Sequence, residues 1–171
     1  MVHSTDNYTI GKAVVKIASI GVSPSFVELG NCPSVAFSIE EERLEHFSSR
    51  GGLKNRDLYP LIQLKYTLTF ECDEITDDNL QKFVKGTKAG AEIYGFQDPN
   101  TEWAIQVVED NPLGPNRTWN FWRGVLSANG ELATIGDDWK KVPLKFEGLA
   151  DEVNHAGSPY FTIEGTSTTT T

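Results

Sequence analysis

Histidines and paired carboxylates are the side chains of this sequence that could carry acid–base or metal chemistry. The chain has three histidines, namely His3, His46 and His155. No two of them have the spacing that places two metal ligands on one face of a helix. Adjacent acids occur at Asp73–Glu74, Asp77–Asp78 and Asp137–Asp138. The first two pairs fit a turn and a helix start, and acids in a turn such as the third are more often solvated than bound to a cation.

The sequence also lacks the short motifs of common enzyme classes. It contains no glycine-rich phosphate loop, no nucleophile elbow and no CxxC motif. We therefore expect no catalytic activity, no metal and no cofactor. The alternative binding chemistry is an aromatic platform for sugars, built from Trp103, Trp119, Trp122 and Trp139. Tryptophans more often fill a core, with one left exposed.

Cys32 and Cys72 are the only cysteines, which is too few for a disulfide scaffold. Both lie in apolar surroundings typical of buried free thiols, and a single bridge between them is the alternative. The N-terminal segment lacks a basic region followed by a long apolar run. We therefore expect no secretion and no membrane span, and we expect the protein to be made and folded in a cytoplasm.

Length and composition predict one β-rich domain. Hydrophobic residues make up 39% of the 171 residues, and the aromatic, Thr and Val content favours strands. We predict a single domain over residues 1–165, followed by a flexible Thr-rich tail over residues 166–171. The formal net charge of -9 argues against a protein that grips nucleic acid through phosphate contacts. It is compatible with a surface past which a polyanion slides without binding.

The element around which the others are arranged is Leu61–Cys72, where apolar and polar side chains alternate. We predict a long strand whose core face carries Ile62, Leu64, Tyr66, Leu68, Phe70 and Cys72. A short helix should follow, with Thr76 as N-cap, acids in the first turn and Gly86 as the residue that ends it. This helix is expected to pack on the sheet to which the strand belongs.

Further strands are predicted over residues 11–20, 26–29, 35–40, 91–96, 103–108, 118–126, 139–147 and 160–164, and a helix is the alternative for residues 11–20. A bulge or bend is expected after Glu40, because Leu44 arrives one residue out of register. Residues 127–131 carry a hairpin-turn signal.

Residues 48–60 show no periodicity and are predicted to form a long loop with basic residues in an otherwise acidic chain. Such a loop could dock onto an acidic neighbour, and a flexible surface loop is the alternative. The candidate docking residues are Arg50, Leu53, Lys54, Arg56, Leu58 and Tyr59. The candidate acids, at an interface or lining a lumen, are Glu40, Glu41, Glu42, Glu45 and Glu71.

The order and spacing of these segments resemble the tail tube, or major tail, proteins of long-tailed bacteriophages. The resemblance is carried by residues 29–80, with their Leu-Gly-Asn lead-in, Glu-rich strand, basic loop, alternating strand and DEITDDNL segment. The NYTIGK start at residues 7–12 and the GDDWKKVPLKFEGLAD segment at residues 136–151 also look like that family. Residues 92–116 add little to this resemblance.

The resemblance implies a β-sandwich or barrel-like subunit with one flanking helix and a long loop that reaches neighbouring subunits. It implies six-membered rings, joined through strand edges that are open in the single chain, and stacking of the rings into a tube in the virion tail. DNA would pass through an acidic lumen during ejection into the host. The implied partners are further copies of the chain and the tape measure, tail terminator and distal tail proteins. The alternatives are a type VI secretion ring protein, which is similar in fold, and a carbohydrate-binding or adhesion sandwich.

Overall fold

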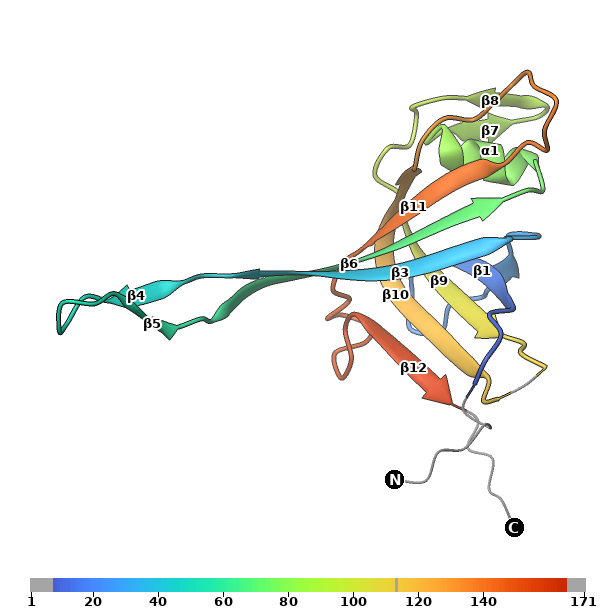
Figure 1. Cartoon of the computed structure of the whole chain (residues 1–171). Helices are drawn as coiled ribbons and strands as arrows, with labels where there is room; N and C mark the ends of the chain where they lie inside the picture. Colours follow the sequence, from blue (N-terminus) through green and yellow to red (C-terminus); the bar gives the residue numbers. More distant parts are fainter. Residues whose placement is uncertain (1–7, 113, 166–171) are drawn as a thin grey trace, which may run out of the picture.

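The protein is described from a computed structural model that covers residues 8–112 and 114–165. The mainly β fold with one helix is confirmed for these residues (Figure 1). The main sheet contains β1 (Ala13–Ser19), β2 (Val27–Glu28), β3 (Ser34–Arg43), β6 (Leu61–Cys72), β9 (Glu102–Glu109), β10 (Arg117–Ala128), β11 (Val142–Gly148) and β12 (Phe161–Gly165). The remaining elements are α1 (Asp77–Phe83) and two small hairpins, β4 (His46–Ser48) with β5 (Asn55–Leu58) and β7 (Thr87–Ala89) with β8 (Glu92–Tyr94). The predicted tail at residues 166–171 lies outside the described residues.

The main sheet bends around an aromatic core. Its strand order is β2-β1-β9-β10-β11-β6-β3, and all pairs are antiparallel. The long β10 pairs with β12 through its first half and with β11 through its second half. Its register with β9 shifts between Phe121 and Gly124, which bends the sheet at that point. As a result, the Phe37 ring of β3 lies 5.6 Å from the Phe121 ring of β10, although these two strands do not pair.

The alternation in β6 predicts its buried face correctly only over the half that lies in the body. Tyr66, Leu68, Phe70 and Cys72 are buried, and they contribute to the hydrophobic core. Ile62 and Leu64 belong to the same face of the strand, but both side chains are exposed. The core-facing stripe of β6 therefore continues beyond the part of the protein that covers it.

The resemblance implies strand edges that are open in the single chain, and half of β6 has none. Residues 67–71 of β6 pair with β3 on one side and with β11 on the other. The half that begins at Leu61 pairs only with β3. The outer edge of β3 has no partner strand among the described residues. The open edges of this ribbon are thus the whole of β3 and the outer half of β6.

Helix α1 begins as predicted and ends differently. Thr76 is the N-cap, and its hydroxyl accepts a hydrogen bond of 3.1 Å from the Asn79 backbone N–H. The left-handed residue after the helix is Lys85, with φ 49°, rather than Gly86. Gly86 donates its N–H to the Gln81 carbonyl at 2.9 Å. A Cβ on Gly86 would lie 2.5 Å from the Tyr94 carbonyl oxygen, so close packing selects this glycine.

Two predicted connections differ from the structure. The long loop at residues 48–60 contains β5, which pairs with β4 and leaves only residues 49–54 as the connection. The turn signal at residues 127–131 lies between two strands that pair antiparallel, β10 and β11, but the connection is longer than a tight turn because β11 starts only at Val142. Sequence periodicity missed β5 because all of its side chains are exposed, so neither face needs apolar residues.

A buried acid organises the connection between β11 and β12. The Asp151 carboxylate accepts hydrogen bonds from the Asn154 backbone and side chain and lies 2.9 Å from His155 Nδ1. The His155 ring stacks on the Trp122 ring, with 3.9 Å between centroids. Burial opposes ionisation of Asp151, but the hydrogen bonds from His155 and Asn154 outweigh it and lower the pKa of this carboxyl group.

A projecting arm as the candidate assembly surface

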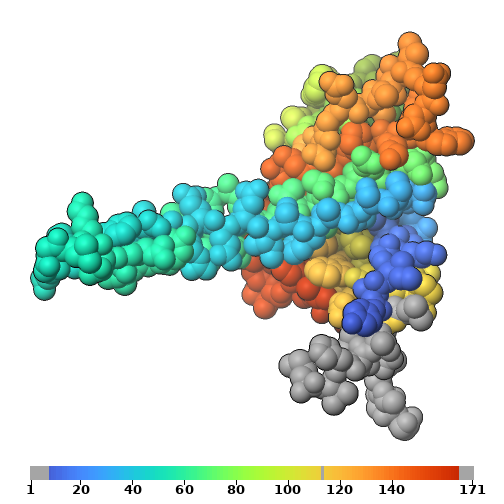
Figure 2. Space-filling view, viewed as in Figure 1, coloured from blue at the N-terminus to red at the C-terminus, as the bar shows by residue number. Residues whose placement is uncertain are grey.

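The candidate functional site is a two-stranded ribbon that extends away from the body (Figures 1 and 2). We call residues 39–64 the arm. It consists of the outer halves of β3 and β6 together with the β4–β5 hairpin at its end. At about 3.3 Å per residue, the 12 residues of β6 span roughly 40 Å, which is twice the length of an ordinary strand. A strand of this length reaches well past the core that buries its inner half.

One face of the arm is apolar and uncovered. Ile39 lies opposite Tyr66 in the register, and Leu64 and Ile62 follow Tyr66 on the same face. The exposed fractions of Ile39, Ile62 and Leu64 are 52%, 55% and 50%. These three side chains, which we call the apolar stripe, continue the core face of the sheet into solvent. Six further exposed apolar side chains lie closer to the end of the arm: Leu44, Phe47, Leu53, Leu58, Tyr59 and Leu61.

The opposite face of the arm is polar. Glu40 pairs in register with Lys65, and Glu42 pairs with Gln63. With its amide oriented to satisfy both neighbours, Gln63 donates to Glu42 at 2.9 Å and accepts from Lys65 Nζ at 3.3 Å. A ribbon with one apolar and one polar face is suited to lie between a neighbouring molecule and water.

The five candidate acids do not form one cluster. By the register, Glu40 and Glu42 share the polar face with Glu71, whereas Glu41 lies on the apolar face and pairs with Arg43 at 3.0 Å. Glu71 lies at the far end of β6, in the body, where Lys141 Nζ is 3.1 Å from its carboxylate. The structure therefore gathers Glu40, Glu41, Glu42 and Glu45 on the arm and separates Glu71 from them.

The predicted basic residues fall into two groups: one pairs within its own chain, and the others have no ion pair among the described residues. Arg56 was expected to meet an acid of a neighbour, but its guanidinium lies 2.9 Å from Glu45 and 4.5 Å from the centroid of the Tyr59 ring in its own chain. This pair ties the two strands of the arm together across the β4–β5 hairpin. Arg50 and Lys54, in the connection between β4 and β5, form no ion pair with any described residue. They are the cations of the arm that remain available to a neighbour.

Sequence reasoning missed the apolar stripe because it assigned Ile62 and Leu64 to the core and did not single out Ile39 for docking. The signal that could have found them is strand length. An alternating pattern of 12 residues is longer than most sheets can cover, so one end of it must leave the body.

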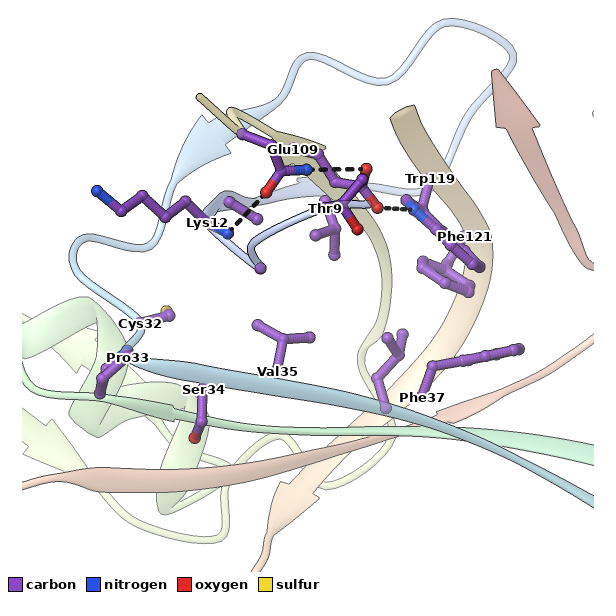
Figure 3. A pocket seen from close by; sticks show the side chains of 15 residues that line it. Thr9, Lys12, Cys32, Pro33, Ser34, Val35, Phe37, Glu109, Trp119 and Phe121 are labelled. Carbon is purple, nitrogen blue, oxygen red and sulfur yellow. Dashed lines mark hydrogen bonds between the residues drawn. The ribbon is translucent and has the colours of Figure 1, made fainter. Parts of the chain in front are cut away.

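A cavity lies in the body, away from the arm. It has a volume of about 230 Å³ and opens between the start of β3 and strands β1, β9 and β10. Figure 3 shows Cys32, Val35 and Phe37 on one side and Glu109, Trp119 and Phe121 on the other. Trp119 Nε1 donates to Glu109 at 2.8 Å, so this carboxylate is already engaged in the wall.

The other candidate residues, the possible metal ligands and the tryptophans, do not come together in one place. Among the described residues, no three His, Cys, Asp or Glu side chains gather in a way that could hold a metal ion. Trp139 is 88% exposed, whereas Trp103, Trp119 and Trp122 are at least partly buried, so the tryptophans do not form one platform. No helix in residues 8–112 or 114–165 is long and apolar enough to cross a membrane.

Comparison with known proteins gives no assignment. No family model matches the sequence, and no curated protein matches it significantly.

Proposed function

We propose that this protein is a structural subunit of a bacteriophage tail tube, without catalytic activity, that polymerises into stacked rings around a conduit for DNA. The observation that carries the proposal is the uncovered apolar stripe on a projecting arm. Three half-exposed aliphatic side chains on one face, with six more apolar side chains closer to the end, would be shielded from water if the arm lay on a neighbouring copy. The resemblance of residues 29–80 to tail tube proteins supplies the identity of the assembly.

Backbone geometry supports the same proposal. The outer edge of β3 and the outer half of β6 present N–H and C=O groups that no described strand satisfies. In a monomer such an edge is open to uncontrolled pairing, and in a ring it can join one sheet to the next. A contact between an arm and a different surface of the next copy is heterologous, and heterologous contacts close into rings or propagate along an axis.

Charge gives the proposed conduit a second property. Glu40 and Glu42 lie on the polar face, opposite the apolar stripe, so seating the stripe on a neighbour leaves these carboxylates facing solvent. Carboxylates that line a bore repel phosphates over roughly 8 Å at physiological salt. The net charge of -9 has the sign that lets DNA pass without binding.

Negative-stain electron microscopy of the purified full chain tests the proposal. Hollow tubes or rings are the expected result at high protein concentration. A strict monomer under the same conditions, together with the absence of rings from tail preparations, would overturn it.

A carbohydrate-binding module is the second candidate, favoured by the exposure of Trp139 beside a shallow hollow lined by Glu131, Asp138 and Lys140. Exposed indole rings stack on sugar faces. A glycan array read with the monomeric protein, and repeated with Trp139→Ala, tests this candidate. Binding that Trp139→Ala abolishes would favour it over the tail tube.

A further inference from the structure

Cys32 and Cys72 lie together at the end of the β3–β6 ribbon that is farthest from the arm, where β3 begins and β6 ends. Their sulfur atoms are 3.1 Å apart, and both residues are free cysteines. A disulfide requires about 2.05 Å between the sulfurs, so a movement of roughly 1 Å would close the bond. The neighbouring backbone already holds the two segments in place, because Asp73 donates its N–H to the Asn31 carbonyl at 3.1 Å.

We propose that Cys32 and Cys72 are a site of reversible oxidation, at which a small-molecule disulfide such as oxidised glutathione converts the two thiols into a bond that links β3 to β6 at the body end of the ribbon. The loop closed by this bond would contain all of β3, β4, β5 and β6 up to Cys72. The bond would join the start of the unpartnered edge strand to the interior strand beside it. With this bond in place, β3 and β6 could not separate at this end of the ribbon.

The two sulfur atoms differ in their exposure to solvent. Cys72 is fully buried, whereas Cys32 is partly exposed and lines the 230 Å³ cavity (Figure 3). The hydrogen bond between the sulfurs raises the pKa of Cys32, with burial adding to the effect, and the same hydrogen bond lowers the pKa of Cys72. The favoured thiolate of the pair is thus Cys72, and the accessible Cys32 becomes the attacking thiolate when it passes its proton to Cys72 across the 3.1 Å contact.

The reaction proceeds by two exchanges. The Cys32 thiolate attacks one sulfur of the external disulfide, forms a mixed disulfide and releases one thiolate. The Cys72 sulfur loses its proton to that thiolate or to water and attacks the Cys32 sulfur. The second external thiolate leaves and takes up a proton. The protein has lost two protons and two electrons, and the oxidant has been reduced to two thiols.

The test treats the reduced, folded full chain with oxidised glutathione and measures intact mass, thiol content and thermal midpoint. We expect a mass lower by two hydrogens, no titratable thiols, and a higher midpoint that returns to the starting value with dithiothreitol. Closing a loop of 40 residues should raise the midpoint of a chain of this size by up to roughly 15 °C. The double variant Cys32→Ser with Cys72→Ser is the control and should show no shift.

Single variants identify the point of attack. Cys72→Ser should accumulate a stable glutathione adduct on Cys32, while Cys32→Ser should stay unmodified as long as it remains folded. Two thiols that persist in the oxidised sample would overturn the proposal. So would bonds found only between chains, or a thermal midpoint lowered by oxidation. None of these readouts depends on tube formation, so the test is independent of the proposed function.

Discussion

Removing the apolar stripe should weaken assembly without unfolding the subunit. The perturbation is Ile62→Ser together with Leu64→Ser, on side chains that are 55% and 50% exposed. Full burial of an Ile or Leu side chain contributes about 1.5–3 kcal/mol, so covering the exposed half of both contributes about 1.5–3 kcal/mol per subunit contact. This free energy corresponds to a rise of roughly 10- to 150-fold in the concentration of free subunit that coexists with tubes.

The assay is a concentration series with pelleting, in which the plateau of soluble protein gives the free subunit concentration and microscopy identifies the pelleted material. Gln63→Ser, on the polar face between the two substituted positions, is the matched control and should leave the plateau unchanged. Circular dichroism should show the same thermal midpoint for all variants. A plateau for the double variant within about twofold of the wild-type value, with tubes of normal appearance, would refute the assignment of the stripe as a contact surface.

Three further predictions concern other parts of the chain. Arg50→Glu with Lys54→Glu reverses the two arm cations that have no ion pair among the described residues, so pelleting should decrease at an unchanged thermal midpoint; normal tubes would remove these cations from assembly. Gly148→Ala would place a Cβ against the ring of Tyr66, and this overpacking should cost about 1–3 kcal/mol, measured as a lower urea midpoint; an unchanged midpoint would contradict the close packing. Because the folded pKa of Asp151 is lowered, its ionised form stabilises the fold above the unfolded pKa of about 3.9, and this stability is lost as pH falls through the folded pKa. Asp151→Asn should therefore flatten the fall of the urea midpoint below about pH 4, and a profile parallel to the wild-type one would show that this carboxyl group is not responsible.

The strand Leu61–Cys72 was predicted with its observed bounds because alternation of side chains is a local property of the sequence. Alternation states which side chains share a face, but it does not state what covers that face. The burial of Phe70 and the exposure of Leu64 follow from the position of β11, which pairs with residues 67–72 only. The arm could therefore not be recognised from the pattern alone.

The basic residues illustrate a second limit of prediction from the sequence. Composition identified Arg50, Lys54 and Arg56 as cations in an acidic chain, but their partners depend on strand pairing. The β4–β5 pairing brings Arg56 beside Glu45, so a residue predicted to contact a neighbour has its partner in the same chain. The end of the helix shows the same limit, since Lys85 takes the left-handed conformation and Gly86 is fixed by the nearby Tyr94 carbonyl.

The acids of β3 have a role that does not require a lumen. An arm with nine exposed apolar side chains and an open edge would pair with other chains indiscriminately before any ordered assembly. Glu40, Glu41 and Glu42 place three consecutive carboxylates on that edge strand, and charged residues on an edge oppose such pairing. Only a partner surface that offers compensating cations or leaves these carboxylates in water can then accept the arm. The same residues that would repel DNA in a tube thus select which surface the apolar stripe can reach, and they keep the free subunit in solution until that surface is met.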